Sequence, residues 1–272
     1  MKRKVSFYSL FSYNHLFRAS INIHWFYMIT LFKNIIPLSA KKVYWRYLKK
    51  QKKAKRRRVK FDGKTAKETF TYIYETNHWS GKESISGGGS DPWHTRVIVE
   101  KVSGLIEDLQ INSVLDLPCG DFAWVKDVDL GDAKYVGGDI VAPLILKNNE
   151  VYGARPNVSF TELDLLKDSL PKMDLLINRD CLVHLSFSDI ALALRRIKSS
   201  GCKYLLTTTY PDHDNKDITT GDWRPLNMEK APFNFGRPVK LIDEQLNKTG
   251  LRDKSLGLWE VSNIDVFEFE KF

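Results

Sequence analysis

Three acidic residues each come at or just after the end of a short apolar run, where a carboxylate can contact a ligand. They are Asp116, Asp139 and Asp164, and a tight turn with Gly120 and Asp121 lies between the first two. A strand, a glycine-containing turn and an acid at the tip of the next strand is how doubly wound α/β folds hold adenosine-containing cofactors. The alternative is an ordinary strand-turn-helix corner without a ligand.

A second polar group follows the fourth apolar run and contains Arg179, Asp180 and His184. Histidine is the side chain best suited to proton transfer near neutral pH. Asp180 could hold or deprotonate a hydroxyl group, and Arg179 could bind an acid or a sugar oxygen. The alternative for His184 is a residue at the start of a helix, packed beneath the ligand.

A third group lies in a long connection that runs from Tyr210 to about Phe235. Connections of this length in compact domains are usually functional or disordered. Its polar and aromatic side chains suit a polyhydroxylated sugar, and the residues expected to contact it are Tyr210, Asp212, His213, Trp223 and Arg224. Three adjacent residues, Asp212 to Asp214, rarely converge on one ion without further ligands, so we predict no metal site.

The elements that must position these groups alternate between strand and helix. Strands are expected at 113–117, 135–138, 158–162, 173–178, 204–208, 255–261 and 264–269, and helices at 95–109, 123–128, 142–152, 188–199 and 239–249. Apolar strands alternating with helices predict an α/β fold with a doubly wound, mostly parallel seven-stranded sheet. The last two strands are expected to form an antiparallel pair at one edge. Ligands bind outside the carboxyl ends of such strands, which gathers the three polar groups at one edge.

The segment from Asn77 to Ser90 is polar and rich in glycine, and it contains Trp79. Glycines let the backbone approach a ligand closely, and the indole offers a flat apolar surface. We therefore expect a flap over the ligand, the alternative being a plain linker.

Charge divides the chain into an arm, residues 1–75, and a body, residues 76–272. Residues 1–60 hold 17 of the 42 basic side chains, whereas all 33 acidic side chains come later. The apolar stretch before Leu38 is interrupted by Lys33 and Pro37, so it is not expected to span a membrane. Val43, Tyr44 and Tyr47 share one face of an expected basic helix.

A basic helix with aromatic residues favours an anionic membrane surface as the partner of residues 1–60. Nucleic acid is a weaker alternative, and a solvated tail or a helix docked on the body is a third. Three widely spaced cysteines suit a reducing compartment with free thiols. We expect a cytoplasmic protein that is peripheral at the membrane.

The body resembles the class I S-adenosylmethionine-dependent methyltransferases over residues 76–272. The resemblance rests on the run Asp116-Leu117-Pro118-Cys119-Gly120-Asp121, on the acids Asp139 and Asp164, and on the run Leu182-Val183-His184-Leu185-Ser186. Asp121 in the turn would repel phosphate, which disfavours NAD and ATP and suits a ligand that bears an amino group or a positive charge. The sequence departs from the family's glycine-rich turn at Pro118 and Phe122.

The resemblance implies S-adenosylmethionine as the cofactor. Its methionine part would face the turn of Asp116, Pro118, Cys119, Gly120 and Asp121, its ribose would face Asp139 and Ile140, and its adenine would face Asp164 and Leu165. Trp79 would lie in the flap.

The sequence therefore predicts a methyltransferase, with a hydroxyl of a glycan or lipid-linked saccharide as the leading acceptor. An RNA methyltransferase that grips phosphates with the arm is a second hypothesis, and the acidic catalytic face argues against it. A non-catalytic module that keeps the fold and the cofactor is the third.

Overall fold

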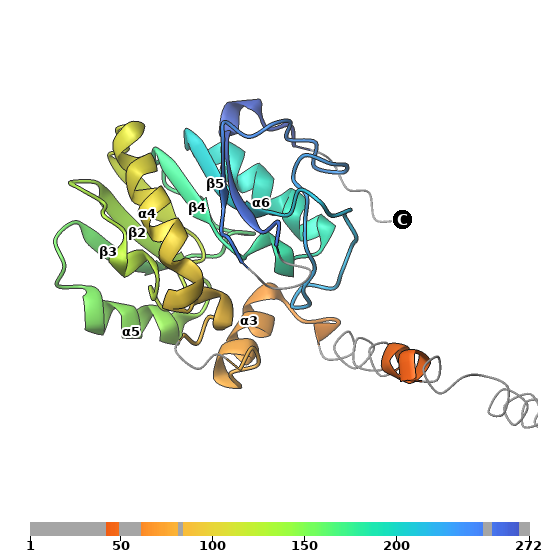
Figure 1. The fold of residues 1–272 in the computed structure, drawn as a ribbon. Coiled ribbons are helices and arrows are strands. Elements are labelled where there is room, and N and C mark those ends of the chain that lie inside the picture. Colours follow the sequence, from red (N-terminus) through yellow and green to blue (C-terminus); the bar gives the residue numbers. More distant parts are fainter. Residues whose placement is uncertain (1–41, 49–60, 81–83, 247–251, 267–272) are drawn as a thin grey trace, which may run out of the picture. The chain divides into compact units, whose positions relative to one another are not determined.

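The structure is a computed structural model that describes residues 42–48, 61–80, 84–246 and 252–266 (Figure 1). Two compact units divide the chain, Met1–Arg57 and Arg58–Phe272. The boundary comes earlier than the expected limit at residue 75, because the helix α3 (Ala66–Glu75) belongs to the larger unit.

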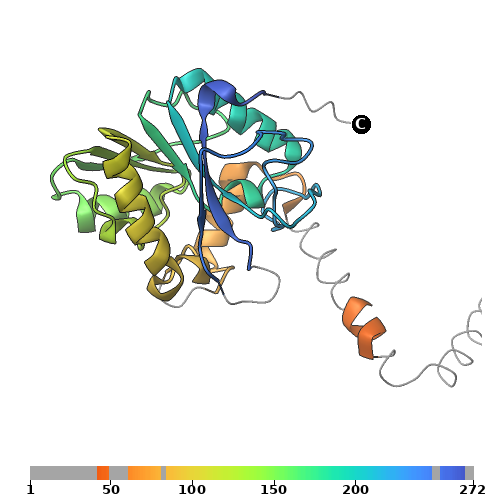
Figure 2. The same ribbon diagram turned by 45° about the horizontal axis from the view of Figure 1, so that its top comes forward.

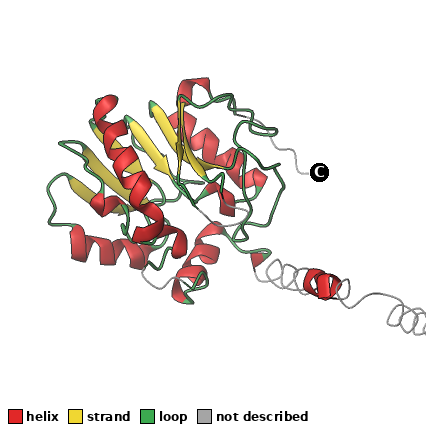
Figure 3. Cartoon of the chain, in the orientation of Figure 1, coloured by secondary structure: helices red, strands yellow, loops and turns green. Residues whose placement is uncertain are grey.

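The larger unit is built on one seven-stranded sheet, which Figure 3 shows in yellow. Its strands are β1 (Ser113–Asp116), β2 (Lys134–Asp139), β3 (Val158–Glu162), β4 (Leu175–Asn178), β5 (Tyr204–Thr209), β6 (Lys240–Asp243) and β7 (Ser255–Glu260). Their order is β3-β2-β1-β4-β5-β7-β6. The first five strands are parallel, and β7 runs antiparallel to both of its neighbours. The predicted fold class is confirmed.

Helices cover both faces of the sheet, because successive strand residues point to opposite sides. Val114 packs in one hydrophobic core with the helices α4 (Pro92–Asp108) and α5 (Ala142–Tyr152). Leu115 packs in the other core with α6 (Phe187–Ser200). Figure 2 shows α4 and α6 on opposite faces of the sheet. Both cores are apolar along the strands, as the predicted doubly wound arrangement requires.

The antiparallel edge differs from the prediction. Residues 239–249 were expected to form a helix, but β6 begins at Lys240, and the partner of β7 is β6. Only Ile242 of β6 is buried, so a four-residue edge strand carries too little apolar pattern to be recognised. Of the expected final strand, Ile264 follows a 3-10 turn and residues 267–272 lie outside the described part.

Two further helices were predicted less well. The expected helix at 123–128 is only a 3-10 turn, Val125–Asp127. The helix α3 was not predicted at all, although Thr65 and Glu68 form a capping box at its start. The capping bonds run from the Glu68 backbone N–H to the Thr65 hydroxyl and from the Thr65 backbone N–H to the Glu68 carboxylate.

The described part of the smaller unit is a helix at residues 42–48, in agreement with the predicted basic helix. Val43, Tyr44, Trp45 and Tyr47 are all exposed on it. The other residues on which the membrane and nucleic-acid predictions rest lie outside the described ranges. Within those ranges, no helix combines the length and the apolar character needed to cross a membrane.

Candidate active site

A cleft opens where the parallel strands end, and most of the predicted ligand-binding residues line it. The predicted residues in its wall are Trp79, Pro118, Cys119, Gly120, Asp121, Asp139, Ile140, Asp164, Leu165, Arg179, Asp180 and His184. They come from the loops after β1, β2, β3 and β4 and from the segment before α4. The topology therefore gathers these groups as the sequence predicts.

Asp116 is the predicted cofactor residue that does not line the cleft. Its side chain is buried behind the turn and accepts a hydrogen bond from the Tyr135 hydroxyl at 2.8 Å. Burial raises the pKa of Asp116 to about 7, although the Tyr135 bond favours the ionised form. Asp116 is thus paired with Tyr135 behind the cleft wall, and a direct contact between Asp116 and the cofactor stays a prediction.

The turn departs from a glycine-rich sequence without losing the backbone path that glycine allows. Phe122 occupies a usual glycine position, and its φ of 57° lies in the left-handed region that glycine favours. Its ring is buried between Tyr135, Tyr152 and Phe160, with ring centroids 5.1 to 5.2 Å away. Aromatic packing on several sides holds this strained residue in place.

Asp121 fastens the flap to the turn. Its carboxylate accepts hydrogen bonds from the Ser84 hydroxyl at 3.0 Å, the Ile85 backbone N–H at 3.0 Å and the Ser86 hydroxyl at 3.2 Å. The flap lies so close that a Cβ on Gly120 would come within 2.3 Å of the Ser86 oxygen. The expected flap is therefore present, and Asp121 has a structural role that its position in the sequence did not reveal.

Asp139 lies at the tip of β2 and keeps hydrogen-bonding capacity toward the cleft. One carboxylate oxygen accepts the Val141 backbone N–H at 3.0 Å, and the other accepts the Gly120 backbone N–H at 3.2 Å. The carboxylate keeps capacity to accept hydrogen bonds from hydroxyl groups of a ligand. Burial raises the pKa of Asp139 to about 6, against the effect of the backbone N–H groups of Val141, Gly120 and Ile140.

Asp164 has a similar local arrangement at the end of β3. Its carboxylate accepts the Leu166 backbone N–H at 2.9 Å, and its own backbone N–H donates to Asp168 at 2.7 Å. The cleft wall beside it is apolar, with Leu165 and Leu185 facing Phe70 of α3. This end of the cleft combines a carboxylate with flat apolar surfaces.

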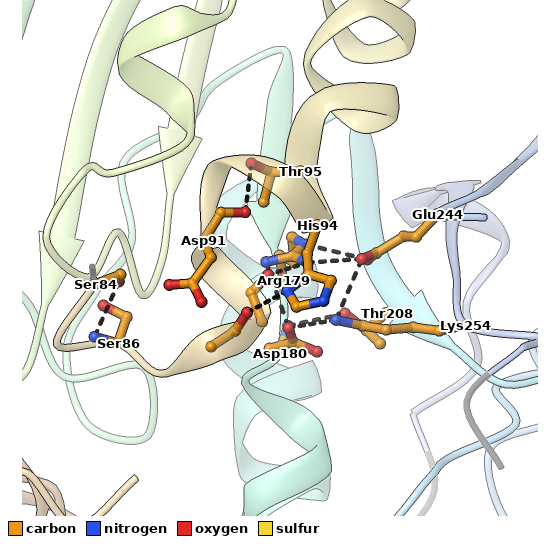
Figure 4. A network of polar contacts seen from close by, with 12 residues as sticks. Ser84, Ser86, Asp91, His94, Thr95, Arg179, Asp180, Thr208, Glu244 and Lys254 are labelled. Carbon is orange, nitrogen blue, oxygen red and sulfur yellow. Dashed lines mark hydrogen bonds and ion pairs between the residues drawn. The ribbon is translucent and has the colours of Figure 1, made fainter. Parts of the chain in front are cut away.

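Arg179 and Asp180 belong to a cluster of four charges (Figure 4). The Arg179 guanidinium makes two hydrogen bonds to Glu244, at 3.1 and 2.7 Å, and one to the Gly89 carbonyl at 2.8 Å. The Lys254 ammonium lies 2.6 Å from an Asp180 oxygen and 3.3 Å from a Glu244 oxygen. Two cations and two anions compensate one another in the interior.

This cluster changes the predicted roles of both residues. Glu244 and Gly89 accept three of the five N–H donors of the Arg179 guanidinium, so its main contacts are structural, and binding of an acceptor by Arg179 stays a prediction. Burial opposes the charge on Asp180, but Lys254 and Arg179 outweigh it and hold the pKa of Asp180 well below its usual range. Asp180 is therefore a fixed carboxylate that accepts hydrogen bonds, and it is too weak a base to remove a proton from a hydroxyl.

His184 is the better candidate base. Its Nδ1 lies 2.8 Å from the Asp222 carbonyl oxygen, so Nδ1 carries the proton and the lone pair is on Nε2. Burial lowers the pKa of His184 to about 4, so the ring is neutral at pH 7. The Trp79 ring lies over it, 4.8 Å between centroids and tilted by 31°. A neutral imidazole thus lies in the cleft wall beneath the indole of the flap.

The long connection after β5 packs against the body and does not line the cleft. Arg224 is buried and donates to the carbonyl oxygens of Leu182 at 2.7 Å and Leu185 at 2.6 Å. Tyr210 is also buried. These two predicted acceptor contacts are structural residues. The connection holds the turn that carries His184, which explains both its length and its polar composition.

The other three residues predicted to bind a sugar lie outside the cleft as well. The His213 Nδ1 and the Asp212 backbone N–H both lie 2.9 Å from an Asp253 carboxylate oxygen. Trp223 is partly exposed and packs edge-on against Tyr210. Among the described residues, no group of three or more His, Cys, Asp or Glu side chains is arranged to hold a metal ion.

Sequence reasoning missed two parts of the site. The helix α3 supplies one wall of the cleft through Ala66, Phe70, Ile73 and Tyr74. The capping box could have predicted this helix, but the segment was assigned to the arm because of the basic residues that precede it. The roles of Lys254 and Glu244 could not be predicted, because nothing near either residue in the sequence indicates that it pairs with Arg179 or Asp180.

Comparison with known proteins finds likeness in structure alone: no protein-family model matches the sequence, and no curated protein does. The structure is similar to human N-acetylserotonin methyltransferase in complex with S-adenosylmethionine, with a TM-score of 0.50 and 18% identity. The alignment covers 73% of this chain and 60% of that one. It is also similar to magnesium protoporphyrin IX methyltransferase from Synechocystis with bound S-adenosylmethionine. There the TM-score is 0.51 and the identity 14%, over 72% of this chain and 97% of that one.

Identities this low establish the fold and leave the substrate open. The seven-stranded, mostly parallel sheet with helices on both faces matches the fold of these two neighbours. The chain has the fold of the class I S-adenosylmethionine-dependent methyltransferases.

Proposed function

We propose that the protein transfers a methyl group from S-adenosylmethionine to a hydroxyl oxygen. The observation that carries the proposal is that two groups line one cleft: the hydrogen-bond acceptor Asp139, on the side of β2, and the neutral His184, on the side of β4.

The residues of the cleft suit this cofactor. Asp139 can accept hydrogen bonds from two ribose hydroxyls, and the apolar wall of Phe70, Leu165 and Leu185 suits a flat purine. Four carboxylates line the cleft, whereas the Arg179 guanidinium, the one Lys or Arg side chain in its described wall, is paired with Glu244. Such a balance attracts a sulfonium and repels phosphate groups.

The chemistry follows from the side chains at the acceptor end. When bound, S-adenosylmethionine supplies an electrophilic methyl group and retains the electron pair of the broken carbon–sulfur bond on sulfur. Nε2 of His184 accepts the hydroxyl proton as the new oxygen–carbon bond forms. Asp180 accepts a hydrogen bond from the acceptor, and Trp79 covers the site against water.

A saccharide or lipid-linked saccharide is the acceptor that we propose. Support comes from the fixed Asp180 carboxylate and the His184 lone pair, which can accept bonds from neighbouring hydroxyl groups, and from the indole of Trp79, on which a sugar ring can stack. The acidic cleft disfavours RNA, whose phosphates would be repelled there.

The cofactor is tested by calorimetric titration with S-adenosylmethionine. We expect the wild-type protein to bind it and the Asp139→Ala variant to lose at least ~100-fold in affinity, because two hydrogen bonds to an ionised group are removed. Asp129→Ala is the matched control, since Asp129 only caps its own loop through the Gly131 backbone N–H at 2.9 Å. A wild-type protein that does not bind the cofactor contradicts the proposal.

The acceptor is tested by incubating the protein and labelled cofactor with lipid-linked sugars, nucleotide sugars and RNA in parallel. Label in a saccharide supports the proposal, and label in RNA replaces it with the nucleic-acid alternative. Cofactor binding without transfer to any acceptor would favour a non-catalytic module.

We also propose a cytoplasmic protein whose arm attaches it to an anionic membrane surface. The support is the concentration of basic residues before residue 61 and the exposed aromatic side chains of the helix at 42–48. The full chain should float with vesicles that contain phosphatidylserine, and a chain without residues 1–60 should not. Equal behaviour of the two chains would contradict this proposal.

A further inference from the structure

Lys254 is a buried lysine whose ammonium is paired with two carboxylates. It comes immediately before β7, and its side chain is only 4% exposed. The ammonium lies 2.6 Å from Asp180 and 3.3 Å from Glu244. Lysine is seldom buried without a specific partner, and here both partners are carboxylates.

The cluster acts on the cleft mainly through Asp180. Glu244 is fully buried, and it pairs with both Arg179 and Lys254. Asp180 is different, because 27% of its side chain is exposed and it lines the cleft. Its backbone N–H donates to the Thr208 hydroxyl at 2.8 Å, so main chain and side chain are both fixed.

The carboxylate fixed in this way acts on His184. The two residues belong to the same loop after β4, and both line the cleft. Burial lowers the pKa of His184 most, the bond to the Asp222 carbonyl and the charge of Asp180 raise it, and the charges of Arg224 and Lys254 lower it. The uncharged ring of Trp79 stacks on the imidazole. Asp180 and Lys254 therefore act on His184 in opposite directions.

We propose that Lys254 is a positioning residue of the methyl-transfer reaction, which fixes the Asp180 carboxylate at the cleft wall and thereby sets the basicity of His184. This role rests on the proposed function, because it presupposes that the cleft carries out methyl transfer. Lys254 does not itself line the cleft. It acts through Asp180, and Glu244 holds both the Lys254 ammonium and the Arg179 guanidinium in place.

The test is a titration of the His184 ring by NMR from pH 7 down to about pH 2.5, without cofactor or acceptor, so that the range extends below the pKa of about 4. The variants are Lys254→Gln, which removes the charge and keeps a hydrogen-bond donor, and Lys254→Arg, which keeps the charge. Lys240→Gln is the matched control, because Lys240 forms an exposed ion pair with Asp108 at 3.1 Å on the neighbouring strand.

We expect the pKa of His184 to rise by at least ~0.5 unit in Lys254→Gln, since a nearby positive charge is lost. It should stay near the wild-type value in Lys254→Arg and in Lys240→Gln. A lysine that only stabilises the fold would lower the unfolding midpoint in Lys254→Gln without moving this titration, and that outcome would overturn the proposal.

A second variant covers the case in which Lys254→Gln does not fold. Asp180→Asn removes the negative charge with little change of shape, so the pKa of His184 should fall. An unchanged titration in a folded Asp180→Asn protein would also overturn the proposal. Calorimetry with S-adenosylmethionine on the wild-type protein keeps the two ideas separate: absent binding contradicts the proposed function, whereas an unmoved titration contradicts the role of Lys254 alone.

Discussion

The carboxylates at the two ends of the cleft are held in different ways. Asp139 accepts backbone N–H groups from the loops that follow β1 and β2, so every contact lies within the motif itself. Asp180 is held by side chains, above all by Lys254, which lies 74 positions later in the chain. The cofactor end is thus built from local backbone geometry, and the acceptor end from charges brought together by the sheet.

This difference predicts that substitutions affect the two carboxylates differently. Backbone donors depend on the path of the turn and tolerate changes of side chain, as Phe122 at a glycine position illustrates. An ion cluster depends on the identity of every member, because removing one leaves a buried charge without a partner. The acceptor end should therefore be the more sensitive to substitution.

The largest expected effect is on turnover at the acceptor end. Replacing His184 with Gln should lower the rate of transfer by ~100-fold to ~10,000-fold, since the group that accepts the proton is lost. Affinity for S-adenosylmethionine should change little, and calorimetry measures it separately from turnover with the acceptor found in the screen. An equal loss of turnover in His213→Gln would show that the connection after β5 contacts the acceptor, and the comparison would fail.

The next effect is on stability, and it tests whether the ion cluster is as sensitive as its burial indicates. Glu244→Gln leaves Arg179 without its main partner, which should cost ~3–5 kcal/mol of unfolding free energy in denaturant titrations. Asp108→Asn breaks the exposed pair with Lys240 and should cost ~1 kcal/mol or less. Similar losses in the two variants would mean that the buried ion cluster is no more sensitive to substitution than an exposed ion pair.

The smallest effect concerns the buried acid behind the turn. The pKa of Asp116 is raised to about 7, so the folded protein holds a proton that the unfolded chain releases as the pH rises from about 4 to 7. Its contribution to stability is therefore lost with rising pH, by at most ~1.4 kcal/mol per pH unit. His184, with its lowered pKa, contributes in the opposite direction between about pH 4 and 6.5.

Asp116→Asn isolates that contribution, because the amide can still accept the Tyr135 hydroxyl. Between pH 6 and pH 7 the variant should lose less stability than the wild-type protein, as measured by urea unfolding. An identical pH dependence of the two proteins would mean that Asp116 is already ionised when folded, so that burial does not govern this end of the cleft.

Local sequence patterns were enough to predict most of the strands and helices of the fold. Short runs of strand-forming residues identified six of the seven strands. Five of these six are buried along most of their length, whereas β3 at one edge buries Phe160 alone. The remaining strand, β6, lies at the other edge with one buried residue, and its sequence was interpreted as part of a helix. The helix α3 was missed for another reason: the charge of the preceding residues was given more weight than its capping box.

The site divides in the same way. Asp139, Asp164 and His184 were identified from the sequence because each comes at the end of a strand or just after one, and parallel strands place those ends together. The sequence by itself thus determined the fold class and which loops surround the cleft. Only the tertiary structure decided what each side chain does there. Lys254 and Glu244 fix Asp180, Arg224 braces the turn of His184, and Asp121 fastens the flap, since contacts across long stretches of chain exist only once the sheet has formed.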